Sequence, residues 1–450
     1  MKTKFILCLS TSLAEVNIPE SGTHVLVAVS GGEDSMCLLH GLIQIKQEFD
    51  LSISVMHVNH GLREAALEDQ HLVEIFAQEN GLPLYVHSLS DVNRSENENI
   101  ESWARLHRYR ALHNKSKEID ANWIFTAHHG NDQVETLLQR IVEGAGPRGL
   151  IGIHKKNGNI LRPLLSCSKH DIREYRIENN IPFIYDVTND DTSFTRNYIR
   201  NDVIPILDKR FDQIVKGVDR TSQSMSEVEE VINYALANLE AKIKIIRSIN
   251  RLSIPLGVLQ NVPLLLQVRF LQKTCDMQAS LRTHEWNQLK HFLVYSKTGN
   301  TINMGDWKIL RNRDELILEK EQVVNDEIEW NTDNPIQFQG YQLIGRIHDS
   351  IPKMNTNPYN ELVDAEKLVS KSLRIRNWTK GDRFTPLGMQ SNKKVSDFLT
   401  DKKIDVFLKE RQFVLTADDD IVWVCGQRIS DTYKITPYTN RVMELTMIQK

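Results

Sequence analysis

The residues of this chain that carry the clearest chemistry are Ser-Gly-Gly-Glu-Asp-Ser at positions 30–35, between two apolar runs. Glycine lets backbone N–H groups approach an anion without a Cβ atom in the way, and a helix N-terminus adds a favourable dipole. The two serines add hydroxyl donors, and Asp34 adds a carboxylate that suits a Mg²⁺ ion bound to phosphates. Two glycines alone would favour a simple strand-to-helix turn, but the full pattern favours phosphate. The predicted nucleotide-binding residues are therefore Ser30, Gly31, Gly32, Glu33, Asp34 and Ser35.

A second set of polar residues, His-His-Gly-Asn-Asp-Gln-Val-Glu, occupies positions 128–135. Asp132 and Glu135 are three residues apart, so both lie in the first turn of a helix predicted over residues 132–143. Carboxylates that face Asp34 from a second strand end would suit Mg²⁺, and we predict Asp34 and Asp132 as the metal ligands. The alternative is that acidic residues simply stabilise the N-terminus of this helix.

Arginines on a further predicted helix, over residues 99–118, are candidates for binding a triphosphate. Glu101, Arg105 and Arg108 are spaced so that they share one face of that helix. Arginine can bind phosphate oxygens through paired hydrogen bonds. A surface helix that carries salt bridges is the alternative. With the acidic residues above, the predicted catalytic residues are Asp34, Arg105, Arg108, Asp132 and Glu135.

Several basic residues elsewhere in the chain are candidates for contact with RNA. They follow a predicted strand, lie in a glycine-rich loop, precede a helix or belong to the tail, and they are His60, Arg63, Arg148, Arg196, Arg200, Arg383, Lys393 and Lys394. In the tail, Trp378 and Phe384 lie among the basic residues, and such a mixture suits phosphate contacts together with base stacking. Each group also has a plainer interpretation, as a strand-end loop, a turn, a capped helix or a solvated charged face.

These motifs require a fold that brings them together. Between residues 24 and 185, apolar strand-like runs alternate with helical ones, and this alternation predicts a parallel sheet covered on both faces. In such sheets ligands bind at the carboxyl ends of the strands, which is where the motifs lie. The expected strands are residues 24–29, 53–58, 83–89 and 123–127, and the expected helices are residues 35–48, 64–80, 99–118 and 132–143.

The predicted fold class is α/β, with a parallel-sheet N-terminal domain, a helical middle domain and a small α+β C-terminal domain. The polar, acidic segment 325–334 is the best candidate for a linker. In the tail, residues 374–376 and 421–424 predict strands, and residues 395–399 predict a helix. The expected domains are residues 1–215 (catalytic), 216–325 (middle, substrate-binding), 326–359 (linker region) and 360–450 (C-terminal, RNA-binding).

The composition is that of an ordinary globular protein, with 40% hydrophobic and 25% charged residues among 450. The net charge of -4 means that any RNA surface must be local. No apolar stretch approaches the ~20 residues needed to cross a bilayer. The five cysteines are far apart and form no Cys-x-x-Cys pair, which favours a reducing cytoplasm and argues against structural zinc or a disulfide framework.

The loop at residues 30–35 resembles the pyrophosphate loop of the N-type ATP pyrophosphatases, the PP-loop superfamily. The ordered series of motifs resembles the tRNA(Ile)-lysidine synthetases. Asn131 departs from their pattern, because many members carry a second aspartate there, and we assign it no metal role. The resemblance rests on residues 30–35, 57–63, 104–109, 127–136, 148–150, 162–165 and 195–200, and in the tail on residues 380–389, 393–399 and 422–430.

The resemblance implies ATP as a substrate, Mg²⁺ as a cofactor, and free L-lysine and a tRNA(Ile) with a CAU anticodon as partners. Enzymes of this family adenylate the oxygen on carbon 2 of the wobble cytidine and release diphosphate. Lysine then displaces AMP, so the anticodon reads AUA and the tRNA changes from methionine to isoleucine identity. The resemblance also implies a cytoplasmic enzyme with no membrane attachment. The sequence leaves the oligomeric state open, a homodimer included.

Two other classes of protein are compatible with parts of the sequence. The first is another enzyme of the superfamily, such as a tRNA thiolase or a glutamine-dependent ligase. The missing cysteine pair and the absence of an amidotransferase domain count against both. The second is a non-catalytic RNA-binding protein with a regulatory nucleotide site, for which Asn131 is the one weak indication.

Overall fold

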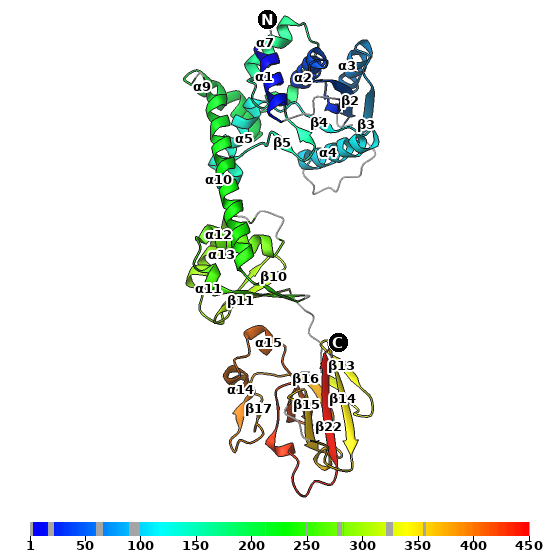
Figure 1. Cartoon of the computed structure of the whole chain (residues 1–450), viewed down its shortest axis with the longest axis vertical. Coiled ribbons are helices and arrows are strands. Elements are labelled where there is room, and N and C mark those ends of the chain that lie inside the picture. Colours follow the sequence, from blue (N-terminus) through cyan, green and yellow to red (C-terminus); the bar gives the residue numbers. More distant parts are fainter. Residues whose placement is uncertain are drawn as a thin grey trace. The chain divides into compact units, whose positions relative to one another are not determined.

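The structure is a computed structural model that describes residues 3–16, 22–59, 66–89, 100–211, 213–248, 250–276, 281, 283–320, 327–353 and 357–449. By their internal contacts the residues fall into two compact units, Met1–Asn233 and Tyr234–Lys450 (Figure 1). The domain boundaries expected at residues 215 and 325 stay predictions. Among the described residues, no helix is both long and apolar enough to span a bilayer.

The N-terminal unit contains a six-stranded sheet with the order β3-β2-β1-β4-β6-β5. All neighbouring pairs are parallel except β5 and β6, which are antiparallel. The parallel sheet predicted from the alternating pattern is therefore confirmed. The strands are β1 (Thr23–Ala28), β2 (Leu51–Asn59), β3 (Leu84–Ser88), β4 (Trp123–Phe125), β5 (Lys156–Asn157) and β6 (Ile160–Leu161).

Helices connect these strands and cover the sheet, as the alternation predicted (Figure 1). The four predicted helices are present with ends shifted by a few residues. The helices are α1 (Lys4–Glu15), α2 (Glu33–Ile45), α3 (Ala66–Glu79), α4 (Ile100–Glu118), α5 (Gly130–Val142), α6 (Pro147–Leu150) and α7 (Lys169–Glu178). After them come η1 (Val187–Asp190), α8 (Thr195–Tyr198), the π-helical turn η2 (Ile199–Val203), α9 (Ile204–Asp208) and α10 (Ile214–Lys242).

The chain reverses its direction across the sheet between β1 and β4. From β1 it adds β2 and β3 on one side, and then crosses to place β4 on the other side of β1. Val27 of β1 pairs with Phe125 of β4, so these two strands end side by side. A reversal of this kind leaves a crevice at the carboxyl ends of the strands, where ligands bind in open α/β sheets. The two strongest sequence motifs follow β1 and β4 directly.

The core confirms that both faces of the sheet are buried. Successive residues of β1 point to opposite faces, so Val25 and Val27 pack in one cluster with α1, α2 and α7, while Leu26 packs in another with α4. Leu26 and Val27 are both fully buried. Burial on both faces explains why the strands are apolar runs rather than alternating ones.

One expectation from the cysteines is wrong. Cys8 of α1 and Cys167, just before α7, form a disulfide across 159 residues of sequence, with their Cα atoms 6.0 Å apart. The sequence spacing gives no hint of this pair, because α1 and α7 meet only through the packing of the folded unit. Cys37, Cys275 and Cys425 are buried free cysteines.

The start of α5 lies against the segment that leads into α7. The Gly130 N–H donates a hydrogen bond to the Cys167 carbonyl at 2.8 Å. A Cβ atom at Gly130 would lie 2.9 Å from that carbonyl oxygen and would also overlap the Val215 side chain. The Asn131 Oδ1 accepts a hydrogen bond from the Lys169 N–H at 2.9 Å. These contacts fix α5 and α7 relative to one another at the edge of the crevice.

The C-terminal unit consists mainly of antiparallel sheets. Its first sheet has the order β7-β8-β11-β10-β9 and is accompanied by helices α11, α12 and α13. The three helices agree with the helical middle domain expected for residues 216–325, and the sheet adds five strands to it. The elements are β7 (Ile246–Ser248), β8 (Arg251–Pro255), α11 (Leu256–Leu259), α12 (Leu264–Thr274), α13 (Thr283–Tyr295), β9 (Thr301–Met304), β10 (Trp307–Arg311) and β11 (Glu315–Lys320).

The tail contains two further sheets and a two-stranded ribbon, in agreement with the predicted α+β character. The sheets have the orders β12-β16-β19-β20-β21 and β13-β14-β22-β15, and β17 pairs with β18. The elements are β12 (Ile328–Glu329), β13 (Ile336–Phe338), β14 (Tyr341–His348), β15 (Asn360–Asp364), η3 (Ala365–Leu368), β16 (Leu373–Asn377), β17 (Arg383–Phe384), β18 (Lys393–Lys394), α14 (Val395–Asp401), α15 (Val406–Glu410), β19 (Phe413–Ala417), β20 (Asp420–Val424), β21 (Arg428–Ile429), η4 (Asp431–Tyr433) and β22 (Val442–Gln449).

The segment expected as a linker, residues 326–359, contributes three strands to these sheets. Strands β12, β13 and β14 lie within it, and Trp330, Phe338 and Leu343 are buried in the C-terminal core. The segment was expected to be a linker because most residues around Trp330 are polar. Its few apolar side chains, which anchor it in the core, give only a weak signal in the local composition. β14 pairs along its whole length with β22 at the chain's end, a partner that local composition does not reveal.

The close contact at Gly130 generates a stability prediction. Gly130→Ala places a methyl group against the Cys167 carbonyl, which cannot rotate away, and should lower the free energy of unfolding by about 1–3 kcal/mol. The melting temperature, followed by calorimetry, should fall by several degrees. Gly217→Ala is the matched control, because Gly217 lies in α10 with no atom within 4 Å of the added Cβ. Equal melting temperatures for the two variants would contradict the proposed constraint.

Candidate active site and RNA surface

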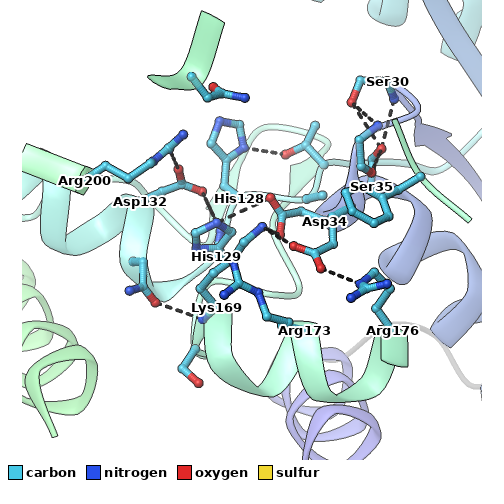
Figure 2. Close-up of a pocket in the computed structure, with 18 of the residues that line it drawn as sticks. Ser30, Asp34, Ser35, His128, His129, Asp132, Lys169, Arg173, Arg176 and Arg200 are labelled. Atoms are coloured by element: carbon cyan, nitrogen blue, oxygen red, sulfur yellow. Dashed lines mark hydrogen bonds and ion pairs between the residues drawn. The ribbon is translucent and has the colours of Figure 1, made fainter. Parts of the chain in front are cut away.

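A cavity of about 1690 Å³ lies at the carboxyl ends of β1, β2 and β4 in the N-terminal unit. Its lining includes residues of the predicted phosphate-binding motif, the residues that follow β4, and the first turns of α7 (Figure 2). Sequence motifs that are about 100 residues apart thus meet in one site, where the reversal of strand order leaves a crevice.

The loop that follows β1 is held in shape by its own hydrogen bonds. The Ser35 hydroxyl accepts a hydrogen bond from the Ser30 N–H at 3.1 Å and donates one to the Gly32 carbonyl at 2.9 Å. Gly31 has a φ of +90°, a conformation that L side chains rarely adopt, and a Cβ there would lie 3.1 Å from the Asp69 Oδ1. The glycine is therefore needed for the turn, and the loop ends at the N-terminus of α2.

Asp34, in the first turn of α2, lies between two cationic side chains (Figure 2). Its Oδ1 is 2.5 Å from the Lys169 Nζ, and its Oδ2 is 3.5 Å from the His129 Nε2. Burial alone would raise the pKa of Asp34, but His129 and Lys169 outweigh burial and hold that pKa far below its usual value. The carboxylate is thus ionised and directed into the cavity.

Asp132 lies in the first turn of α5, as the sequence predicted, whereas Glu135 lies in the second turn because the helix begins at Gly130. The His129 N–H donates to the Asp132 Oδ2 at 2.9 Å. Arg196 and Arg200 then bind both carboxylates: their guanidinium nitrogens are 2.8 and 3.2 Å from the Asp132 Oδ1, and 2.7 and 2.6 Å from the Glu135 oxygens. Glu135 is almost fully buried. The two arginines expected to contact RNA therefore also neutralise buried acids, and their role in RNA binding stays a prediction.

His129 connects the two carboxylates predicted to bind Mg²⁺. Its Nε2 lies 3.5 Å from the Asp34 Oδ2 and 3.6 Å from the Asp132 Oδ2. Burial would lower the pKa of His129, but Asp132 and Asp34 outweigh it and raise that pKa. The His129 ring thus lies between two carboxylates.

The donor set around His129 fits a Mg²⁺ ion. Mg²⁺ prefers oxygen ligands and is commonly held by one or two carboxylates together with substrate phosphates and water. Asp34 and Asp132 are such carboxylates, and one oxygen of each lies within 3.6 Å of the His129 Nε2, in the cavity that the phosphate loop also lines. In the described part of the chain, no group of three or more His, Cys, Asp or Glu side chains is arranged to hold a metal alone. This arrangement suits an ion that arrives with a phosphate ligand.

A basic wall closes another side of the cavity. Arg105 and Arg108 lie on α4 over the Tyr109 ring, with 5.2 and 5.4 Å from guanidinium carbon to ring centroid, and Arg108 lines the cavity. His128 donates to or accepts from the Thr126 hydroxyl at 3.0 Å. Burial, together with the neighbouring arginines, lowers the pKa of His128 to about 3 against the opposing effect of Asp132. A neutral imidazole beside several arginines is suited to an anionic ligand.

Several residues of the site escaped the sequence analysis. Lys169 and Arg176 of α7 and the bridging His129 lie in the cavity, and Lys169 and Arg176 both pair with Glu33, at 3.0 and 2.7 Å. Lys169 is 135 residues from its partner Asp34 in sequence, and no local pattern indicates such a pair. Asn131, the residue that departs from the family pattern, accepts the Lys169 N–H and so helps to position that lysine.

The remaining predicted residues of this unit have mixed outcomes. Arg148 lies exposed in the short helix α6 and does not line the cavity. His60 and Arg63 lie outside the described residues. For Arg105 and Glu101, the shared helix α4 is confirmed.

The predicted RNA surface of the tail is built on the ribbon β17–β18. Arg383 pairs in register with Lys394, so these two residues are adjacent across the strands. Lys393 forms an ion pair with Asp401. Arg376 binds Asp382 through two hydrogen bonds of 2.8 and 3.0 Å, and the Thr379 N–H donates to the same carboxylate at 2.8 Å. Asp382 thus anchors the turn that presents the basic ribbon.

The two aromatic residues expected to stack on bases occupy other positions. Phe384 is 4% exposed and packs edge-to-face against Phe398 in the core, so it is not a stacking surface. Trp378 is partly buried, and its indole N–H donates to the Lys409 carbonyl. The alternation of the ribbon turns Phe384 inward where its neighbour Arg383 faces outward. The basic residues therefore remain, and the predicted stacking by Phe384 is wrong.

Comparison with known proteins agrees with this geometry at both ends of the chain. Residues 7–207 match the family described as the PP-loop domain, and residues 373–445 match the family described as the TilS substrate C-terminal domain. The tRNA(Ile)-lysidine synthase of Clostridium perfringens is 31% identical, over 96% of this chain and 97% of that protein. The enzyme of the same name from Bacteroides thetaiotaomicron is 30% identical, over 93% and 94%. That of Thermosipho africanus is 38% identical, over 51% and 56%.

A phosphate loop at the reversal point of a parallel sheet, with acidic residues after the neighbouring strand, defines a PP-loop protein that uses ATP. The relatives that match almost the whole chain identify one family within this class. The chain belongs to the tRNA(Ile)-lysidine synthase family.

The partly buried Arg376–Asp382 pair predicts a dependence of stability on pH. Burial raises the pKa of Asp382, but hydrogen bonds from Arg376 and the Thr379 N–H outweigh burial and lower it. Because the folded pKa is lower than the unfolded value of about 3.9, the pair stabilises the protein fully above about pH 5 and loses this effect as the pH falls through the folded pKa. Asp382→Asn should therefore cost about 1–3 kcal/mol near pH 7 and almost nothing near about pH 2.

Calorimetry of the full chain at several pH values measures this difference. Asp401→Asn is the control, because that carboxylate is 66% exposed and pairs with a surface lysine. Its effect should stay within about 0.5 kcal/mol at every pH. If the stability lost in Asp382→Asn does not become smaller as the pH falls, the stabilisation comes from the packing of this side chain and not from its charge.

Proposed function

We propose that this protein ligates free L-lysine to carbon 2 of the wobble cytidine in the CAU anticodon of tRNA(Ile), with conversion of ATP to AMP and diphosphate. The observation that carries the proposal is the convergence of the Ser30–Ser35 loop and the first turn of α5 on one cavity, in a chain related to lysidine synthases over nearly its full length. We place the reaction in the cytoplasm, where tRNA is used.

The first step is the adenylation of the cytidine. The oxygen on carbon 2 of the base attacks the α-phosphorus of ATP, and the bond to the oxygen that bridges the α and β phosphorus atoms breaks. The Ser30–Ser35 loop supports this role because its backbone N–H groups lie at the start of α2, where the helix dipole favours phosphate. Gly31 lets the loop pack closely against Asp69, where a Cβ atom would lie 3.1 Å from the carboxylate.

Asp34 and Asp132 are the residues that would hold Mg²⁺. The ion would shield the negative charge of the phosphates when it is bound. His129 contacts both carboxylates. Its ring Nε2 lies beside the Asp34 carboxylate, and its backbone N–H donates a hydrogen bond to the Asp132 carboxylate. Arg196 and Arg200 hold the other side of Asp132, so this carboxylate keeps its orientation.

The basic wall on α4 suits the phosphate that remains on the base after adenylation. Arg108 reaches the cavity, and Arg105 lies beside it over the same tyrosine ring. Paired hydrogen bonds from guanidinium groups would orient that phosphate for departure. We therefore assign Arg105 and Arg108 to the adenylate rather than to the tRNA backbone.

The second step joins lysine to the base. The ε-amine must first lose a proton, and it then attacks carbon 2. The carbon–oxygen bond to the adenylate breaks, and its electron pair leaves with AMP. Because the cavity lining includes several carboxylates besides the two proposed metal ligands, it can attract the cationic lysine.

The basic ribbon of the tail is the proposed contact with the tRNA. Arg383 and Lys394 are adjacent across β17 and β18, and neither has an ion-pair partner among the described residues. Adjacent unpaired cations suit phosphate contacts, which depend strongly on salt. Another PP-loop enzyme that modifies tRNA, or a non-catalytic RNA-binding protein, would also fit the ribbon, so the reaction itself must be tested.

The test of the function is a reaction of purified protein with Mg²⁺, ATP, radiolabelled lysine and a CAU-anticodon tRNA(Ile) transcript. We expect label in this transcript, equal amounts of AMP, and no label in a methionine tRNA. Release of AMP without incorporation of lysine would indicate a different nucleophile and another PP-loop enzyme. The absence of AMP would favour the non-catalytic alternative.

Removal of the Asp34 carboxylate should abolish adenylation. Asp34→Ala and the isosteric Asp34→Asn should each lower the rate of diphosphate release by at least about 100-fold, because a positioned charge in a closed site contributes about 3–4 kcal/mol. The affinity for tRNA, measured by filter binding, should stay the same. Asp219→Asn on the exposed face of α10 is the control. Diphosphate release at the wild-type rate from Asp34→Asn would overturn the assignment.

Reversal of charge on the ribbon should weaken tRNA binding. The double variant Arg383→Glu with Lys394→Glu should raise the Kd for tRNA about tenfold or more. The slope of the logarithm of affinity against the logarithm of salt concentration should become shallower by about two, because each lost phosphate contact reduces that slope by about one. Lys393→Glu alone should have a smaller effect, since Lys393 is already paired with Asp401. The control is Lys367→Glu, whose Nζ donates to the Thr432 carbonyl away from the ribbon. An equal loss in the control would mean that only net charge matters.

A further inference from the structure

Three cationic residues follow one face of α7 and line the cavity beside Asp34. Lys169, Arg173 and Arg176 are spaced at i, i+4 and i+7, so they share that face. Figure 2 shows them along the helix next to Asp34 and the Ser30–Ser35 loop. We call these three residues the α7 cationic ridge. The roles proposed above for the phosphate loop and the α4 arginines leave this ridge unexplained.

The ridge carries more positive charge than its partners neutralise. Lys169 binds Asp34 at 2.5 Å and Glu33 at 3.0 Å, and Arg176 binds Glu33 at 2.7 Å. Arg173 forms no ion pair with any described residue and has an exposed side chain on the cavity lining. Two acids therefore face three cations. An incoming polyphosphate would supply the missing negative charge.

Asp34 links the ridge to the metal site. If this carboxylate binds Mg²⁺, as proposed, it becomes a weaker partner for the Lys169 ammonium, whose side chain is 30% exposed on the cavity lining. A phosphate oxygen beside the loop is the natural new partner, because the charge-assisted hydrogen bond between an ammonium and a phosphate is strong. Lys169 would then hold Asp34 in the empty site and bind phosphate in the filled one.

The position of the ridge is set by the same contacts that set α5. Ser168 caps α7 by accepting the Asp171 N–H at 3.1 Å, and Asn131 accepts the Lys169 N–H. The Gly130 N–H donates to the carbonyl of Cys167, the residue before Ser168. Because α5 carries Asp132, the ridge and the second metal carboxylate are positioned as one piece. A flexible surface lysine would not have these constraints.

We propose that the α7 cationic ridge is the binding site for the β- and γ-phosphates of ATP and for the pyrophosphate that leaves, with Lys169 as its central contact. The inference rests on the proposed function. When the bond from the α-phosphorus to the bridging oxygen breaks, the electron pair stays on that oxygen and pyrophosphate gains negative charge. Lys169, beside Asp34, stabilises that charge, and Arg173 and Arg176 hold the distal phosphate. The AMP part of the nucleotide does not touch the ridge.

Binding of two separate ligands tests this division of the site. Isothermal titration calorimetry of the full chain with Mg²⁺ measures inorganic pyrophosphate and AMP independently. Lys169→Met should weaken pyrophosphate binding about tenfold and change AMP binding less than about twofold; a tenfold change is about 1.4 kcal/mol. Arg173→Met should weaken pyrophosphate by about threefold. Lys169→Arg, which keeps the charge, should recover most of the affinity.

Lys155→Met is the matched control, because this lysine pairs with Glu15 outside the cavity and does not line it. Its affinities should equal those of the wild type. Equal loss of AMP and pyrophosphate in Lys169→Met would show a merely structural role, and unchanged pyrophosphate affinity in that variant would overturn the proposal. Neither titration, with pyrophosphate or with AMP, requires lysine or tRNA. If the wild type binds both ligands but incorporates no lysine, the proposed function fails while the ridge stands.

Discussion

The pairing of β1 with β4 is the constraint on which the rest of the site depends. The chain leaves β1, adds β2 and β3 on one side, and returns to place β4 on the other. Because parallel neighbours end at the same edge, the residues after Val27 and after Phe125 are forced together. The phosphate loop and the acidic start of α5 owe their proximity to this one register, although nearly 100 residues separate them.

Charge compensation explains how so many ionised groups can share one cavity. Glu135 is almost fully buried and is held by two arginines, while Asp34 is held by a lysine and a histidine. Leaving any one of these charges unpaired in a poorly solvated site would cost several kcal/mol. The site is therefore pre-organised for anions before a ligand binds, with His129 as the group shared by both proposed metal carboxylates.

The C-terminal unit follows a different logic, in which a small core supports a basic ribbon. Phe384 and Val395 are buried, and Arg383 and Lys394 are carried to the surface by the alternation of β17 and by the turn that Asp382 anchors. The ribbon needs no aromatic side chain to be presented. The strands β12 to β14 belong to this architecture as well, even though their sequence is polar enough to resemble a linker.

Local pattern was sufficient for the elements and for the main motifs of the N-terminal unit. Apolar runs that are buried on both faces mark parallel strands, and Gly31 marks a turn that only glycine tolerates, so both could be read from neighbouring residues alone. Asp132 and Glu135 could be placed together on one helix for the same reason. Each of these inferences uses contacts within a few residues of sequence.

Long-range partners were decided only by the tertiary structure. Nothing near Lys169 indicates that it reaches Asp34, nothing near Cys8 indicates Cys167, and nothing near Trp330 indicates that it belongs to the C-terminal core. The inward turn of Phe384 depends on the register of a two-residue ribbon. Sequence by itself determined which chemistry this protein carries, because residue type and local spacing encode it. The folded structure decided which charges meet, because that depends on how distant helices pack.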